Sequence, residues 1–151
     1  MSGDPKVVVL GVGNLLMADE GVGVRCAQAV ERVVPPHVRV IDGGTSTHEL
    51  LEDLEDLDLL IIVDAVASGR APGAIVRLED GSIPSAFSNK LSPHQHGIND
   101  LLATLRLLGR APRRVVLLGV EPKRVALDLE LSPEIAAALP ALIARVVREI
   151  G

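Results

Sequence analysis

The segment VVVLGVGNLLMADEGVG, residues 7–23, constrains the fold more than any other part of the chain. Its apolar run Val7–Leu10 leads directly into Gly11-Val12-Gly13, a pattern that predicts a buried strand and a tight turn into a helix. Strands that enter dinucleotide-binding loops begin in the same way. A dinucleotide fingerprint also requires a third small residue at position 16, however, where this chain has Leu16.

Two acids, Asp19 and Glu20, stand where such a loop would receive a phosphate. Carboxylates near a helix start are stabilised by the helix dipole, but they repel a phosphate group. We therefore predict that this loop binds a cation or a substrate group and does not bind a nucleotide. The plainer alternative is that both acids only stabilise the first helical turn.

Along the rest of the chain, apolar runs alternate with amphipathic stretches. This pattern predicts one α/β domain, residues 1–151, built as a three-layer sandwich with a five-stranded, mainly parallel sheet and helices on both faces. The expected strands are Val7–Leu10, Val38–Ile41, Leu57–Val63, Ala74–Leu78 and Val115–Val120. The most apolar run, Leu57–Val63, is predicted to be central, and Ala74–Leu78 to be an antiparallel edge strand.

Helices are expected between these strands. They run from near Glu20 to Val33, from the capping box Ser46-Thr47-His48-Glu49 through Leu54, along the apolar face Ile98–Leu108, and from a Ser132 cap through Ile150. Pro140 is expected to kink or divide the last helix. The residues between Glu79 and Pro93 form a loop long enough to predict a functional role.

Four candidate site residues are predicted at one edge of this sheet, because ligands of open parallel sheets collect beyond the carboxyl ends of the strands. Glu20 follows the first strand, Asp42 ends the second, Asp64 ends the third, and His94 lies in the loop system after the fourth. Three carboxylates within ~5 Å would repel by about 3 kcal/mol per pair at an effective dielectric near 20, so a cation or protonation must offset the repulsion. Two carboxylates and an imidazole suit a borderline divalent metal and leave positions open for water or substrate.

Each candidate also has a plainer interpretation. Asp64 and Asp42 could simply initiate turns, since aspartate is favoured there, and Asp42 precedes Gly43-Gly44. His94 could be an ordinary loop histidine. His96 is a rival ligand, because in an extended loop side chains two residues apart point the same way, whereas a tight turn would separate them.

Composition narrows the function further. A formal net charge of −5 and a pI near 5.3 argue against nucleic acid as a partner. The single cysteine, Cys26, excludes an internal disulfide and fits a reducing compartment, and its apolar neighbours on the expected helix indicate a core residue, not a nucleophile. With no apolar stretch before the first strand, we expect a soluble cytoplasmic protein without a membrane segment. The only aromatic residue, Phe87, either packs onto the core or contacts a protein partner, and we favour the partner contact.

The order of six motifs resembles the hydrogenase maturation endopeptidases, and the resemblance covers nearly all of the chain. The motifs are GVGNLLMADEGVG, IDGGT, IIVDAV, SPHQHG, LGVEP and ELSPEI. Members of this family trim the C-terminus of the large subunit of nickel–iron hydrogenases after nickel insertion. The resemblance implies that Glu20, Asp64 and His94 contact nickel, with the His-Gln pair favouring His94 over His96.

The predicted function is therefore an endopeptidase that processes a nickel–iron hydrogenase large-subunit precursor, with nickel carried by the precursor. Glu20 and Asp64 are expected to engage the metal, and Asp42 to position water or substrate. The nickel could polarise the scissile carbonyl, or serve only as a recognition element. The alternatives are an autonomous metallohydrolase and a non-catalytic nickel-binding assembly scaffold.

Overall fold

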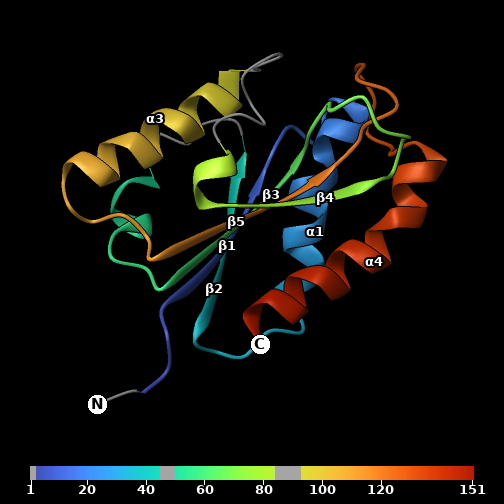
Figure 1. Ribbon diagram of the computed structural model, residues 1–151. Helices are drawn as coiled ribbons and strands as arrows, with labels where there is room; N and C mark the ends of the chain where they lie inside the picture. The colour runs from blue at the N-terminus through green and yellow to red at the C-terminus, as the bar shows by residue number, and fades with distance from the viewer. Residues whose placement is uncertain (1–2, 45–49, 84–92) are drawn as a thin grey trace.

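The computed structural model describes residues 3–44, 50–83 and 93–151, and for residues 93–96 only the backbone. The chain forms a five-stranded sheet with strand order β2-β1-β3-β5-β4 (Figure 1). Strands β1, β2, β3 and β5 run parallel, and β4 is antiparallel to β5 at one edge. The predicted α/β architecture with a mainly parallel sheet is confirmed.

The strands are β1 (Val7–Val12), β2 (Val38–Gly44), β3 (Leu59–Ala65), β4 (Ile75–Glu79) and β5 (Arg114–Val120). Every residue of β3 is buried, as expected for a strand covered on both faces at the centre of the sheet. No residue of β4 is fully buried, which agrees with its edge position. The predicted central strand and the predicted antiparallel edge strand are thus both confirmed.

Helices cover both faces of the sheet. Helices α1 (Val22–Val30) and α4 (Pro133–Ile150) lie on one face, and α3 (Pro93–Leu107) lies on the other (Figure 1). Alternate residues of β3 enter the two cores, since Ile61 packs beneath α1 and α4 whereas Ile62 packs beneath α3. The same alternation determines the face on which each acidic strand residue lies.

The first helix is shorter than predicted. A 3₁₀ turn, η1 (Ala18–Gly21), precedes α1, and α1 ends at Val30 instead of Val33. The N–H of Val22 donates to the carbonyl oxygen of Asp19 in the tighter pattern of a 3₁₀ turn, so the α-helix begins only after this turn. Helix α4, in contrast, is continuous across Pro140, and the proline does not divide it.

Two further 3₁₀ turns, η3 (Glu52–Leu54) and η4 (Asp80–Ser82), complete the described elements. The predicted capping box at residues 46–49 and Phe87 lie outside the described residues. Within the described part of the chain, no helix combines the length and apolarity needed to cross a membrane.

Gly23 allows α1 to approach the sheet closely. A Cβ atom at this position would lie 2.2 Å from the carbonyl oxygen of Val63 and 2.5 Å from that of Val12. Only glycine fits such a contact with two backbones. The first turn of α1 is therefore fixed against the carboxyl ends of the neighbouring strands β1 and β3.

Candidate functional site

The turn after β1 brings two predicted site residues together. Gly13 has a φ of 137°, and a Cβ atom there would lie 1.9 Å from the carbonyl oxygen of Glu20 and 3.8 Å from Oδ1 of Asp64. The 3₁₀ turn that carries Glu20 also packs against β3, which carries Asp64. The side chain of Glu20 is half-buried, and no described residue donates a hydrogen bond to its carboxylate.

Asp64 lies inside β3 and is fully buried, whereas the sequence placed it at the strand end. Asp64 comes two residues after Ile62 on the same strand, so both lie on the same face of the sheet, the face that α3 covers. Oδ1 accepts a hydrogen bond of 2.8 Å from the backbone N–H of Ala65. A buried carboxylate requires such partners, because burial without them carries a large desolvation cost.

His94 lies in the first turn of α3 and not in the predicted loop, because the helix begins at Pro93. Proline is favoured at this first helical position. Helix α3 precedes β5 and runs antiparallel to the sheet strands, so its first turn lies at their carboxyl edge, on the face that holds Asp64. The side chain of His94 falls outside the described residues, and its assignment as a metal ligand stays a prediction.

Asp42 does not join Asp64. It lies within β2, opposite Gly11 of β1. Asp42 comes two residues after Val40 and four after Val38, so it lies on the same face as these valines, the face that α1 covers. Its side chain is exposed, and Oδ1 accepts a hydrogen bond of 2.9 Å from the N–H of Gly44. Among the described residues, no three acidic, histidine or cysteine side chains gather closely enough to hold a metal ion.

Asp19 is a buried acid that the sequence analysis treated only as a neighbour of Glu20. Its Oδ2 accepts hydrogen bonds from the N–H groups of Lys123 (2.9 Å) and Arg124 (2.7 Å) and from Oγ of Ser132 (2.8 Å), and its Oδ1 accepts one from the N–H of Ser132 (2.7 Å). Burial by itself would raise the pKa of Asp19, but these bonds outweigh it and hold the pKa below the usual 3.8. Ser132 is the N-cap residue of α4, as predicted, but its hydroxyl binds Asp19 and makes no capping hydrogen bond to the helix.

Glu121 is a second buried acid with a structural role. Its Oε1 accepts hydrogen bonds from the N–H of Ser68 (2.9 Å), Oγ of Ser68 (2.9 Å) and the N–H of Arg70 (2.8 Å). Burial opposes ionisation, yet these bonds hold the pKa of Glu121 below its usual 4.5. The sequence could have identified Glu121 as a candidate, because it directly follows an apolar run, as Asp64 does.

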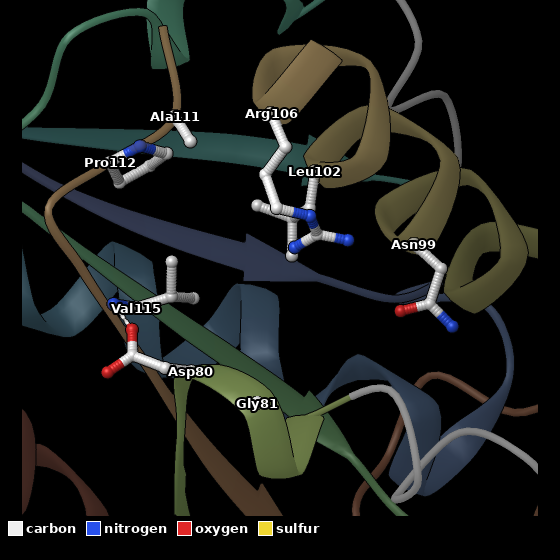
Figure 2. A pocket seen from close by; sticks show the side chains of 8 residues that line it. All are labelled: Asp80, Gly81, Asn99, Leu102, Arg106, Ala111, Pro112 and Val115. Carbon is white, nitrogen blue, oxygen red and sulfur yellow. Dashed lines mark hydrogen bonds between the residues drawn. The ribbon is translucent and has the colours of Figure 1, made fainter. Parts of the chain in front are cut away.

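Two cavities of about 340 Å³ lie in different parts of the molecule. One is lined by Asp42 and by the turn after β1. The other lies between α3 and η4, where Figure 2 shows Asn99 and Arg106 on the helix and Asp80 opposite them. Asp80 accepts a hydrogen bond from the N–H of Val115 at the start of β5, so this second cavity opens toward the amino edge of the sheet, away from Glu20 and Asp64.

Known proteins resemble this chain over most of its length. The family model of the hydrogenase maturation proteases, HycI, matches residues 24–149. The chain belongs to the hydrogenase maturation protease family. The predicted family and the predicted class of enzyme, an endopeptidase, are confirmed.

Individual relatives span nearly the whole chain. The Hydrogenase 2 maturation protease of Escherichia coli is 42% identical over 97% of this chain and 93% of its own length. A solved structure, the hydrogenase maturating endopeptidase HybD from E. coli, superposes with a TM-score of 0.92 at 39% identity, covering 96% of this chain and 91% of that one. The [NiFe] hydrogenase maturation protease HybD from Thermococcus kodakarensis has a TM-score of 0.83 at 25% identity, with coverages of 97% and 99%.

Proposed function

We propose that this member of the family removes the C-terminal extension of a nickel–iron hydrogenase large-subunit precursor after nickel has been inserted. The observation that carries the proposal is that the backbone of Glu20 and the carboxylate of Asp64 both lie beside Gly13, at the carboxyl edge of the sheet. Relatives named as hydrogenase maturation proteases, similar over almost their full length, support it. A cytoplasmic location is part of the proposal, and the buried free thiol of Cys26 is compatible with it.

Nickel enters this reaction as part of the substrate. We infer that Glu20, Asp64 and His94 engage nickel that precursor side chains already hold. Such a contact would bring the scissile bond against the carboxyl edge of the sheet. There a metal can polarise a carbonyl group or lower the pKa of a bound water.

The helical position of residue 94 supports His94 over His96. Position 94 lies one turn before the buried Ile98, on the side of α3 that packs against the sheet. Positions 94 and 96 are about 200° apart around a helix axis. One site therefore cannot use both, and position 94 is the one in line with the sheet-facing residues.

Asp42 has a different proposed role from the metal-engaging residues. It lies on the opposite face from Asp64 and lines the cavity with Gly13 and Asn14. This location supports an action on the peptide chain of the substrate beside the turn after β1. We propose that Asp42 positions that chain, and that Glu20 and Asp64 act on the nickel side.

The proposal is tested by comparing two forms of one precursor. Metal-free enzyme is mixed with nickel-loaded and with nickel-free precursor, and the electrophoretic mobility of the large subunit is followed. Three ligands, two of them hard carboxylates, hold free nickel weakly, whereas nickel fixed by the precursor arrives with its ordering cost already met. We expect cleavage of the nickel-loaded form alone.

The other outcomes distinguish the alternatives. Equal cleavage of both forms would contradict nickel recognition and identify a general peptidase. Binding of the precursor without cleavage would identify a scaffold. Tight binding of Ni²⁺ or Zn²⁺ by the purified enzyme, measured by metal analysis, would identify an autonomous metallohydrolase.

A further inference from the structure

Four large apolar side chains are exposed beside the turn that carries Glu20. They are Leu16 (54% exposed), Val125 (52%), Leu127 (82%) and Leu129 (60%), and we refer to them as the apolar rim. A solvent-exposed group of this kind in a folded protein commonly marks a contact surface for a partner.

The two segments of the apolar rim are joined through their backbones. The N–H of Asp128 donates to the carbonyl oxygen of Leu16 (2.9 Å), and the N–H of Ala18 donates to the carbonyl oxygen of Asp128 (2.8 Å). Leu127 and Leu129 flank Asp128, so they lie next to Leu16. The buried carboxylate of Asp19 fastens the ends of the same segment through Arg124 and Ser132. The rim is therefore preorganised, and binding would require little further ordering.

Most charged groups of this segment are paired within the protein. Arg124 pairs with Asp128 (2.7 Å), and Lys123 pairs with Glu134 (2.5 Å). The guanidinium group of Arg25 donates to the carbonyl oxygen of Leu129. Glu130 is an exposed acid beside Leu129, so the rim suits an apolar polypeptide segment better than an acidic one.

Leu16 connects the rim to the substrate side of the site. It also lines the cavity of about 340 Å³ that contains Gly13, Asn14 and Asp42. The apolar rim therefore continues into the cavity beside the turn on which Glu20 and Asp64 converge. A chain bound along both would pass next to the proposed nickel contact.

We propose that the apolar rim and this cavity bind an extended, apolar segment of the hydrogenase precursor next to its scissile bond. The inference rests on the proposed function, because it takes the precursor as the occupant. It adds the surface that recognises the protein part of the substrate, separately from the residues that engage nickel. Leu127 and Leu129 would then determine affinity without taking part in the chemistry.

The test uses the double variant Leu127→Asp/Leu129→Asp. Its control is Leu107→Asp at the far end of α3, where the side chain is 89% exposed. Cleavage of nickel-loaded precursor gives KM and kcat, and immobilised enzyme gives the Kd of the complex independently of cleavage. We expect KM and Kd to rise ~10-fold or more in the rim variant, with kcat within about twofold of wild type, because hot-spot side chains contribute to binding. The control should match the wild type in all three.

Unchanged KM and Kd in a folded rim variant would overturn the inference. So would a change confined to self-association, seen by sedimentation, because the rim would then bind a second copy of the chain. Rim-dependent binding without cleavage by the wild-type enzyme would contradict the proposed function and leave the binding surface supported. Absence of any binding to wild type would contradict both.

Discussion

Two loops at the carboxyl edge of the sheet have different roles. They are residues 13–21 after β1 and residues 121–132 after β5. The first carries Glu20, whose carboxylate receives no hydrogen bond from the described residues. The second supplies three of the four donors to Asp19 from its backbone, and it contributes Glu121, which binds the loop at residues 68–70. The first loop thus carries a carboxylate that is available to a ligand, and the second loop holds adjacent segments in place through hydrogen bonds.

The contrast is sharpest between the adjacent residues Asp19 and Glu20. Hydrogen bonds that stabilise a carboxylate also satisfy it, so Asp19 has little capacity left for a metal or substrate. Glu20 keeps its acceptor capacity and is held in place by its neighbour. This pair of neighbouring acids therefore contains one structural carboxylate and one that is available for the function we propose.

The largest effect is expected from Glu20→Gln. This change should abolish precursor processing, because a neutral amide is a much weaker metal contact than a carboxylate. The thermal midpoint should stay the same or rise slightly, since the Glu20 carboxylate accepts no hydrogen bond from the described residues. Gel mobility of the precursor and a thermal melt measure the two results. Normal processing by this variant would remove Glu20 from the site.

Asp64→Asn and His94→Ala should also abolish processing. Asp64 differs from Glu20 because it is fully buried in β3, so its variant requires a check of folding by circular dichroism. His96→Ala is the matched control for His94→Ala, as the two positions lie in the same helical turn. Processing that survives His94→Ala and fails in His96→Ala would reverse the assignment.

Asp19→Ala, unlike Glu20→Gln, should lower the stability of the fold. Four donors would lose a buried charged acceptor, so we expect the free energy of unfolding to fall by about 3 kcal/mol or more. Chemical denaturation measures this loss. A stability equal to that of wild type would show that the two loops are held together by other contacts.

The pH dependence of stability should separate the same two acids. The pKa of Asp19 is lowered on folding, so its stabilisation is complete above its usual pKa of 3.8 and is lost as the pH falls through the lower folded value. The difference in unfolding free energy between wild type and Asp19→Asn should therefore be constant near neutral pH and shrink below about pH 4. Glu20→Gln serves as the control, measured over the same pH range.

Much of this division could be predicted from the sequence, and part could not. The central strand, the antiparallel edge strand and the buried Cys26 follow from apolar runs and their neighbours. The buried state of Asp19 depends on donors more than 100 positions away, at Lys123, Arg124 and Ser132, and no local pattern reveals such a contact. The same holds for the face of Asp42, since a one-residue difference in strand register reverses it.

Glycine spacing gave a partly correct signal. The pattern Gly11-Val12-Gly13 predicted a tight turn into a helix, and the structure confirms it. What the spacing did not reveal is the close contact of Gly23 with two strand ends, which needs three-dimensional proximity between α1, β1 and β3. A similar limit applied to His94, because a proline that follows a sequence rich in Gly, Pro, Ser and Asn is compatible with either a loop or a helix start.

The smallest effect is expected from Cys26→Ala, which tests whether the helix behind the first loop contributes more than support. Cys26 is fully buried on α1 in the core between that helix and the sheet, and burial raises the pKa of its thiol to about 12. The neutral thiol is a poor nucleophile at physiological pH, so the substitution should cost about 1 kcal/mol of packing and leave processing intact. Denaturation and the precursor mobility assay measure the two quantities. Loss of processing in a variant that stays folded by circular dichroism would instead make α1 part of the chemistry, and the division between the two loops would no longer describe the site.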